Sequence, residues 1–570
     1  MSNARRRPPW GLPSRAATER TIIGAVVGIV TALIALAVAQ LVAALISSPI
    51  GAPVDAVGAL SIDHAPAAVK DFAINEFGSN DKTVLVWGIR VVLILFAIAI
   101  GIVAVRKLWL GMAGLAIFAG IGLVAALTRP TAKATDALPT LIGAGVAAFA
   151  MSYLADLARG RPAARWRPRS RLANSGERPV PAGSSAAPVP ASAAASAAAS
   201  ASAAAAAADE DFQPDRRRFL TIGAVAAGIS VLTYAGGSWL GNTRDVNAVQ
   251  QALKLPRPSR TVPPLPPGTD FKIPGLSSFI TPNGNFYRVD TAIIVPEILP
   301  AHWKLRIHGM VQREVVLTFD DLIHRPLVED YITLCCVSNP VGGPYIGNAK
   351  WLGVSLRSLL QEAGIKPGAD QLFCTSSDGF TSGTPVQTAM DGRSAMLAVA
   401  MNDSALPVEH GFPVRLVIPG LYGYVSACKW IVDIEVTTYA ANSAYWTQRG
   451  WFAQAPVKTE SRIDIPGQNS IKAGKPTPIA GVAWAQHKGI EAVEVRVAKG
   501  PWREARLAAV PGIDTWRQWV YDWDVSVRPG NYMIEARATD KTGYTQTSAQ
   551  VPPAPNGATG YPTSFVNVVS

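Results

Sequence analysis

Cysteine and histidine are scarce in this chain. Its 570 residues include 4 cysteines and 6 histidines, and no two cysteines have C-x-x-C spacing. So few cysteines in so long a chain argue against a disulfide scaffold, and the missing pair argues against a zinc ribbon or thioredoxin-type site. All the histidines lie outside the long apolar runs, so those runs carry no ligands for a b-type haem and no haem is expected.

Acidic residues are also outnumbered. The 40 Asp and Glu residues face 52 Lys and Arg residues, which gives a net charge of +12. Much of the basic excess lies beside apolar segments, at 5–7, 159–171 and 216–218. Basic clusters in such places are typical of membrane-orientation signals, so we expect no nucleic-acid partner.

Hydrophobic residues make up 49% of the chain, and long runs account for the excess. Four apolar stretches occupy 21–46, 83–105, 108–127 and 138–157. Each is close to the roughly twenty residues that a helix needs to cross a bilayer. The sequence therefore predicts four transmembrane helices within 21–157, and the total length leaves room for about two or three further units.

Charge predicts the orientation of these helices. The basic N-terminus 1–20, the turn at 106–107 and the tract 159–171 are placed in the cytoplasm, and the acidic loop 51–82 outside. Gly24-x-x-x-Gly28 and Ala116-x-x-x-Gly120 have the small-residue spacing that allows close helix contact.

An Ala/Ser/Pro-rich tract at 158–215 is predicted to be a cytoplasmic linker. The segment 216–240 follows, with three arginines, Phe-Leu and a mildly apolar run. It is similar to a twin-arginine export signal, and an ordinary fifth transmembrane helix with basic flanks is the alternative. Either way, the rest of the chain is expected outside the cytoplasm.

From about residue 271 the composition becomes that of soluble globular domains. A Pro-rich spacer covers 241–270, an α+β domain is predicted over 271–445, and alternating short strands over 446–570 predict a β-sandwich. The expected fold class is therefore multi-domain: a helical membrane bundle, an α+β domain and a sandwich.

The most informative stretch is 331–343, where a thiol ends an apolar, β-branched run before a Gly/Pro-rich turn. A strand delivers a side chain into a pocket at such a place, and a thiolate is a soft ligand for a heavy transition metal. In a second stretch, 410–420, Arg415 interrupts an apolar strand, where a charge needs a partner.

Together with 282–290 and 422–430, these segments resemble the sulfite oxidase family of molybdopterin-dependent oxidoreductases. The Thr333-Leu-Cys-Cys-Val-Ser-Asn339 motif implies that Cys336 ligates molybdenum and that Cys335 holds a variable position. The resemblance covers about 271–570, and it implies that 446–570 is an Ig-like dimerisation domain and that the protein forms a homodimer. It also implies a plain molybdopterin cofactor.

The resemblance assigns roles to further residues. It gives cofactor binding to Asn283, Tyr287, Arg288, Thr384, His410, Arg415, Ser426 and Lys429. Arginine suits such a site because its planar fork binds phosphate bidentately. Arg288 and Arg449 are, with Cys336, the candidate catalytic residues, as arginines of the substrate pocket.

One departure concerns the substrate. Sulfite oxidases follow the Cys-x-x-Asn motif with two arginines, whereas Pro340-Val-Gly-Gly follows Asn339 here. A less charged oxo-compound, such as a sulfoxide or an organic oxide, is therefore expected in place of sulfite. The haem domain of animal sulfite oxidases is also absent, so we expect a separate electron carrier, either a cytochrome or quinone-linked.

These inferences predict a multi-pass protein of a bacterial-type inner membrane, with an extracytoplasmic module that transfers oxygen atoms to or from a small molecule. A membrane-tethered Ig-like binding protein without catalysis is the alternative, and the intact set of Cys336, His410 and Arg415 argues against it. A receptor or transporter is disfavoured because no cluster of ionisable residues lies within the spans.

Overall fold

A computed structural model describes most of the chain. The described residues are 15–46, 53–64, 69, 81–128, 132–159, 216–242, 246–292, 295–467, 470–474, 476–524 and 528–569. The chain forms two compact units, Met1–Thr243 and Arg244–Ser570. The predicted linker 158–215 and the basic residues 5–7 lie almost wholly outside the described residues.

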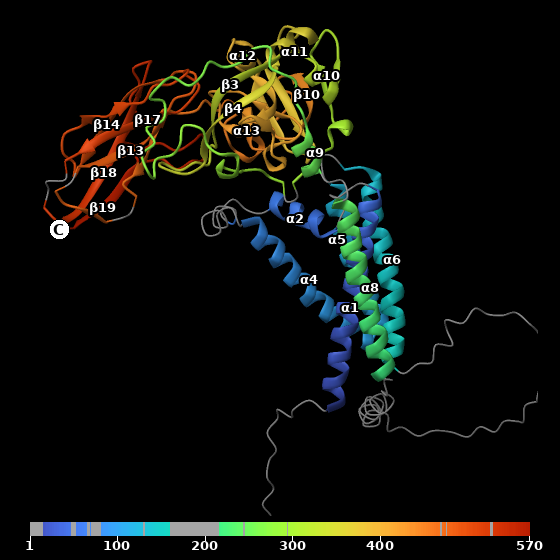
Figure 1. The fold of residues 1–570 in the computed structure, drawn as a ribbon. Coiled ribbons are helices and arrows are strands. Elements are labelled where there is room, and N and C mark those ends of the chain that lie inside the picture. Colours follow the sequence, from blue (N-terminus) through green and yellow to red (C-terminus); the bar gives the residue numbers. More distant parts are fainter. Residues whose placement is uncertain are drawn as a thin grey trace, which may run out of the picture. The chain divides into compact units, whose positions relative to one another are not determined.

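The first unit is helical (Figure 1). Its helices are α1 (Arg15–Leu45), α2 (Pro53–His64), α4 (Asp81–Arg106), α5 (Leu108–Leu127), α6 (Leu138–Ala158) and α8 (Arg216–Asn242). Among the described residues, 4 helical segments are long and apolar enough to cross a membrane: Thr18–Leu45, Val84–Arg106, Leu108–Leu127 and Ala134–Ala158. The four predicted apolar helices are thus confirmed as helices.

One feature of this unit differs from expectation: helix α2 lies within the predicted external loop 51–82, and its Ala56 is buried against Ala125 and Ala126 of α5. Helix α8 forms at the predicted fifth span, and Thr221–Tyr234 within it is apolar. A fifth crossing stays a prediction.

Glycine allows α1 and α4 to approach closely. A Cβ at Gly101 would lie 2.2 Å from the carbonyl oxygen of Gly24 and 2.3 Å from the nitrogen of Gly28. The Gly24-x-x-x-Gly28 pair is therefore a helix contact, as predicted. A Cβ at Gly120 would meet nothing within 4 Å, so the second small-residue pair makes no close contact through Gly120.

The second unit begins with two sheets. The first has the order β2-β1-β10-β5-β6, and the second has the order β3-β4-β7-β8, with β9 paired to β7. The strands are β1 (Lys304–Gly309), β2 (Val315–Thr318), β3 (Leu327–Cys335), β4 (Ile346–Ser355), β5 (Gln371–Ser376), β6 (Thr381–Pro385), β7 (Met396–Met401), β8 (Ser404–Ala405), β9 (Arg415–Val417) and β10 (Ile431–Thr437). The helices of this part are α9 (Val246–Ala252), α10 (Phe319–Ile323), α11 (Leu356–Ala363), α12 (Val386–Met390) and α13 (Gly423–Ser426).

Local sequence explains several of these elements. All six residues of β7 are buried and apolar, as suits a strand covered on both faces. Helix α11 begins at Ser355, whose hydroxyl accepts a bond from the nitrogen of Ser358, and ends at Gly364 with φ of 70°. Its Leu356, Leu359 and Leu360 face the core.

Two further sheets follow, with orders β11-β13-β17-β16 and β12-β19-β18-β14-β15 (Figure 1). Their strands are β11 (Glu460–Ile465), β12 (Ser470–Lys472), β13 (Thr477–Trp484), β14 (Ile490–Val497), β15 (Arg503–Glu504), β16 (Arg506–Leu507), β17 (Arg517–Trp523), β18 (Gly530–Asp540) and β19 (Thr563–Val569). Residues of both sheets, among them Val493, Trp519 and Ile534, share one core. Two sheets around one core agree with the predicted sandwich, while its Ig-like classification remains a prediction.

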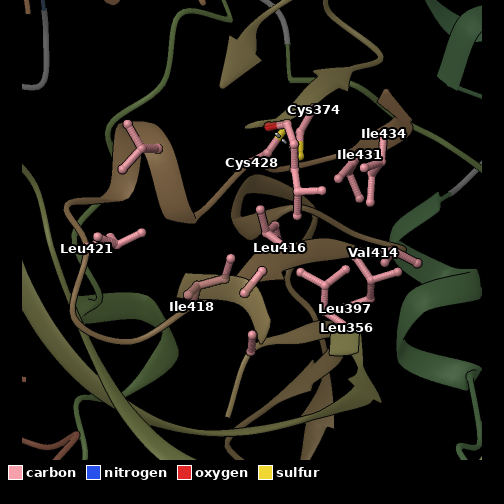
Figure 2. Packing of buried hydrophobic residues seen from close by; sticks show 14 of the residues in the cluster. Leu356, Cys374, Leu397, Val414, Leu416, Ile418, Leu421, Cys428, Ile431 and Ile434 are labelled. Carbon is pink, nitrogen blue, oxygen red and sulfur yellow. Dashed lines mark hydrogen bonds between the residues drawn. The ribbon is translucent and has the colours of Figure 1, made fainter. Parts of the chain in front are cut away.

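The main core of the unit crosses the predicted boundary at 445/446. Trp484 and Trp516 from the sandwich region belong to the same cluster as Leu356, Leu397 and Leu416. Figure 2 shows the centre of this cluster, where the sulfur atoms of Cys374 and Cys428 lie near one another among aliphatic side chains. The boundary therefore separates two sets of sheets that pack as one body.

Candidate active site

Strand β3 places Cys336 in a cavity. Cys335 is the last residue of the strand, pairs with Ile346 and is fully buried in the core. Successive side chains of a strand face opposite ways, so the next thiol faces the other side. Cys336 is 8% exposed and lines a cavity of about 120 Å³.

Asn339 holds the loop that follows. Its backbone nitrogen donates to the carbonyl oxygen of Cys336 at 3.1 Å, and its Oδ1 accepts from the nitrogen of Tyr345 at 2.8 Å. A Cβ at Gly343 would lie 2.6 Å from that Oδ1, so the loop needs glycine there. The loop thus fixes the position of the Cys336 sulfur.

The surroundings of Cys336 oppose ionisation of the free thiol. Burial raises the pKa of Cys336, while hydrogen bonds from Ser338 and the positive charge of Lys429 act in the opposite direction. A bound metal cation would supply the charge that a thiolate needs. The thiol is therefore suited to act as a ligand.

Arg415 is a buried cation without a carboxylate partner among the described residues. Its guanidinium is held by backbone carbonyl groups: Nη1 donates to His410 at 3.0 Å and Nη2 to Ala427 at 3.3 Å. It also lies over the ring of Trp351, 5.1 Å from the centroid. Burial lowers the pKa of Arg415 to about 10. Because Arg415 lines the cavity, an anion bound there would be its natural partner.

His410 lies beside Arg415 on the cavity wall and is uncharged. Its Nε2 is 3.2 Å from the carbonyl oxygen of Asn283 and acts as the donor, which leaves Nδ1 as an acceptor. Burial and the positive charges of Arg415 and Lys429 lower the pKa of His410 to about 3. The imidazole can therefore bind a ligand by hydrogen bonds but not by charge.

Lys429 and Arg288 share one carboxylate. The Nζ of Lys429 is 2.6 Å from Oδ2 of Asp290, and the Nε of Arg288 is 2.8 Å from the same atom. Burial lowers the pKa of Lys429 to about 8, although Asp290 favours its charged form. Lys429 and Asp290 line the cavity, whereas Arg288 lies behind Asp290 with 39% of its side chain exposed.

Aromatic side chains complete the cavity wall. Tyr287 lines it and stacks on Phe286, with ring centroids 5.3 Å apart. Burial raises the pKa of Tyr287 well above its ordinary value, so the phenol stays protonated. Trp451 packs against Trp446 at 6.1 Å and Tyr424 at 6.0 Å, and all three line the same cavity.

Five predicted residues line the cavity together: Tyr287, Cys336, His410, Arg415 and Lys429. The others do not line it, and their roles remain predictions. The Asn283 amide donates to the Met401 carbonyl at 3.3 Å and accepts from Asn402 at 2.8 Å. The Arg449 guanidinium donates to the Tyr445 carbonyl at 2.8 Å and lies 3.6 Å from the centroid of that ring.

Thr384 and Ser426 are fully buried behind the cavity wall. The Thr384 hydroxyl donates to the carbonyl of Val425, and the Ser426 hydroxyl lies 2.9 Å from the carbonyl oxygen of Leu421. Because both hydroxyls face backbone carbonyls, direct donation to a cofactor finds no support in this arrangement. Both instead hold α13, the helix that carries cavity residues Gly423 and Tyr424.

Five polar residues of the cavity were not predicted from the sequence: Asp290, Thr291, Ser338, Ser376 and Asp378. Ser338 lies in the Cys336 motif, and Asp290 follows Arg288 by two positions, so proximity to known motifs was the available signal. Asp378 lies in the turn between β5 and β6, and burial raises its pKa. The Asp378-Gly379 pair, which is typical of a hairpin turn, was the available signal there.

The donor set fits a molybdopterin cofactor. Among the residues that the structure describes, no group of three or more His, Cys, Asp or Glu could hold a metal ion. A metal at Cys336 would therefore take its other ligands from a non-protein group. The cations Arg415 and Lys429 suit the anionic part of such a group.

Comparison with known proteins agrees with this arrangement. Residues 292–446 match the family described as "Oxidoreductase molybdopterin binding domain". The uncharacterized oxidoreductase YuiH of Bacillus subtilis is 31% identical over 149 residues, which cover 26% of this chain and 72% of that protein.

Two sulfite oxidases are also similar. The mitochondrial enzyme of Drosophila melanogaster is 30% identical over 219 residues. The match covers 34% of this chain and only 37% of the Drosophila enzyme. The enzyme of Gallus gallus is 28% identical over 323 residues, covering 48% of this chain and 69% of its own length. The chain belongs to the sulfite oxidase family of molybdopterin-dependent oxidoreductases.

Proposed function

We propose that this protein is a membrane-anchored molybdenum-cofactor oxidoreductase that transfers an oxygen atom to or from a small, weakly charged sulfur- or nitrogen-oxo compound. The composition of the cavity carries the proposal. One thiol, that of Cys336, lines the cavity together with two buried cations, Arg415 and Lys429, and a group of aromatic side chains. The cofactor, when bound, supplies the two-electron oxygen-atom transfer.

The chain's own groups bind and orient that cofactor. Cys336 offers the sulfur ligand, and Arg415 and Lys429 offer positive charge to a phosphate. His410 is neutral and has a free acceptor at Nδ1, while the protonated Tyr287 offers a hydroxyl donor. Thr384 and Ser426 position α13 through their bonds to backbone carbonyls.

The substrate side of the cavity supports a weakly charged compound. Trp446, Trp451 and Tyr424 supply apolar surface there. Arg288 is paired with Asp290, and Arg449 is held on Tyr445. Neither arginine lies in the cavity wall, and Arg415 and Lys429 are assigned to the cofactor, so a dianion such as sulfite would have no cation of its own.

Asp378 is suited to hold a proton near the substrate. Its carboxyl group lines the cavity, and burial raises its pKa. Removal of oxygen from a sulfoxide or N-oxide as water consumes two protons, so a carboxyl group with a raised pKa beside the substrate favours this class. Asp378 is therefore a candidate general acid.

Location and partners belong to the same proposal. The four apolar helices support an anchor in a cell membrane, and the predicted orientation places the second unit outside the cytoplasm. Reducing equivalents would pass to or from a separate electron carrier. The sandwich strands β11–β19 would form a homodimer contact, as the family resemblance implies.

Metal analysis tests the proposal. The full chain is purified in detergent from cells able to make the cofactor, with Cys336→Ser and the control Cys374→Ser, whose thiol is buried in the core. We expect near-stoichiometric molybdenum in wild type and the control, and its loss or an altered metal spectrum in Cys336→Ser. Well-folded wild-type protein without molybdenum would refute the catalytic proposal.

Activity then tests the substrate class. We expect dye-linked reduction of sulfoxides or N-oxides to exceed oxidation of sulfite by at least an order of magnitude in kcat/KM. Faster oxidation of sulfite by molybdenum-loaded protein would refute the weakly charged substrate and leave the cofactor assignment intact.

A further inference from the structure

The helical unit contains an apolar cavity of about 170 Å³. Residues of α1, α2, α4, α5 and α6 line it, including Ala35, Val57, Leu93, Phe118 and Ala144. The lining residues among those described carry no charged side chain. An ion or a strongly polar ligand is therefore a poor occupant.

Two hydroxyl groups in the lining have no hydrogen-bond partner. Thr31 of α1 is 2% exposed and Thr140 of α6 is 5% exposed, and both Oγ1 atoms are buried and unpaired among the described residues. A buried polar group without a partner is costly and uncommon in folded proteins. A ligand that accepts hydrogen bonds would remove this cost.

Other buried or half-buried hydroxyls in the same unit behave differently. The Oγ of Ser152 donates to the carbonyl of Ala148 at 2.8 Å, and that of Ser230 donates to Ala226 at 2.8 Å. This bond to the carbonyl four residues earlier is the usual solution for a hydroxyl in an apolar helix. Thr31 and Thr140 do not use it, and both lie on the cavity.

From these observations we infer that the cavity binds the ring of a lipid-soluble quinone, an apolar ring whose carbonyl oxygens accept bonds from Thr31 and Thr140. A cavity of roughly 150 Å³ lined by aliphatic and aromatic side chains takes one benzene molecule in another protein, so the size is that of a single ring. A lipid acyl chain would fill the space but offers no acceptor to the hydroxyls. The inference goes beyond the oxygen-atom chemistry and rests only on the proposed membrane location.

The test uses the full chain in detergent, freed of bound lipid, with a short-chain ubiquinone such as decylubiquinone as the probe. Binding is followed by equilibrium dialysis and by the shift in thermal unfolding. Thr31→Val/Thr140→Val removes both donors at nearly constant shape, Ala35→Leu fills the cavity, and Ser152→Ala is the control outside it. Toluene serves as a ring without carbonyl groups.

We expect saturable binding of the quinone by wild type and the control. The double valine variant should bind it about tenfold more weakly, because each hydrogen bond contributes a few-fold, while toluene binding is unchanged. Ala35→Leu should weaken both probes.

Three results would overturn the inference. They are no saturable binding to wild type, equal quinone affinity in the double valine variant, or full binding to Ala35→Leu. If a variant fails to fold, the wild-type comparison of quinone with toluene still decides, since equal affinity for the two would mean a general apolar cavity. Molybdenum content measured on the same samples reports the proposed function separately.

Discussion

Replacement of Arg415 by methionine separates a cofactor role from a structural one. Methionine keeps much of the unbranched side chain but removes the guanidinium and its charge. In the cofactor-free protein that charge is buried, without a carboxylate partner among the described residues, and held by the His410 and Ala427 carbonyls. Its loss should therefore affect cofactor retention more than folding.

The expected effect on stability follows from two opposing contributions. Burial lowers the pKa of Arg415 from 12.5 to about 10, which at about 1.4 kcal/mol per pH unit corresponds to about 3 kcal/mol. Because the folded pKa lies below the unfolded one, this is a cost to the fold at every pH below about 10, and methionine removes it. The two carbonyls left without this donor cost about 1–3 kcal/mol each, so the net change should lie between a gain of about 1 kcal/mol and a loss of about 3 kcal/mol.

The assay has two arms. Urea denaturation of cofactor-free chain, from cells that cannot make molybdopterin, gives the change in free energy of unfolding. Molybdenum content of protein from competent cells gives cofactor retention, which we expect to fall at least tenfold. Arg393→Met is the matched control, because Arg393 is 2.6 Å from Asp391, donates to the Pro419 carbonyl at 2.7 Å and lies outside the cavity lining. It should lose about 1–3 kcal/mol of stability and keep its molybdenum.

A large loss of stability or an unchanged molybdenum content would contradict a cofactor role for Arg415. A loss of more than about 4 kcal/mol in the cofactor-free protein would show that the guanidinium is a structural element of the fold. Full molybdenum content in a stable Arg415→Met protein would show that no anionic group of the cofactor binds there.

Further predictions concern stability. Burial raises the pKa of Glu460 from 4.5 to about 8, so the folded state keeps a proton that the unfolded chain releases. The free energy of unfolding should therefore fall as the pH rises from about 4.5 to about 8. Glu460→Gln should flatten this slope, as measured by urea denaturation at several pH values. Trp516→Phe removes the indole donor to the buried Phe279 carbonyl at 2.9 Å and should cost about 1–3 kcal/mol by the same measurement; an unchanged midpoint would contradict it. Gly101→Leu should separate α1 from α4 and lower the thermal unfolding temperature or the yield of folded protein, whereas Gly120→Leu, facing open space, should leave both unchanged.

The helices could be predicted because their signal is local. A run of about twenty apolar residues forms a helix wherever it lies, and the four runs match α1, α4, α5 and α6 closely. Helix α2 was missed because it is short and contains two aspartates and a histidine. Its helical state depends on the packing of Ala56 against α5, a contact that no local pattern records.

The grouping of several candidate cofactor residues in one cavity could be predicted for a related reason. Cys336, His410, Arg415 and Lys429 each belong to a short motif, and all four line one cavity. The hydrogen-bond partner of a hydroxyl group, by contrast, cannot be predicted from a short motif. Thr384 has the right chemistry for a phosphate, but its hydroxyl donates to the carbonyl of Val425, which the tertiary fold brings beside it.

The two adjacent cysteines show what the motif at 333–339 adds to the alternation of side chains along a strand. Strand β3 ends at Cys335 and Cys336 follows it directly, so one thiol should face inward and the other outward, but alternation alone does not say which. The register decides: Cys335 pairs with Ile346 and joins the core, so Cys336 faces the cavity. On the side of β3 away from β4, the backbone nitrogen of Thr333 donates to the carbonyl of Asp514 at 2.9 Å, and its hydroxyl accepts from the nitrogen of Trp516 at 2.8 Å. The sandwich region therefore holds the strand that leads to the proposed metal ligand, Cys336. Removal of that region should release Cys336 from the site, even though no described sandwich strand lines the cavity.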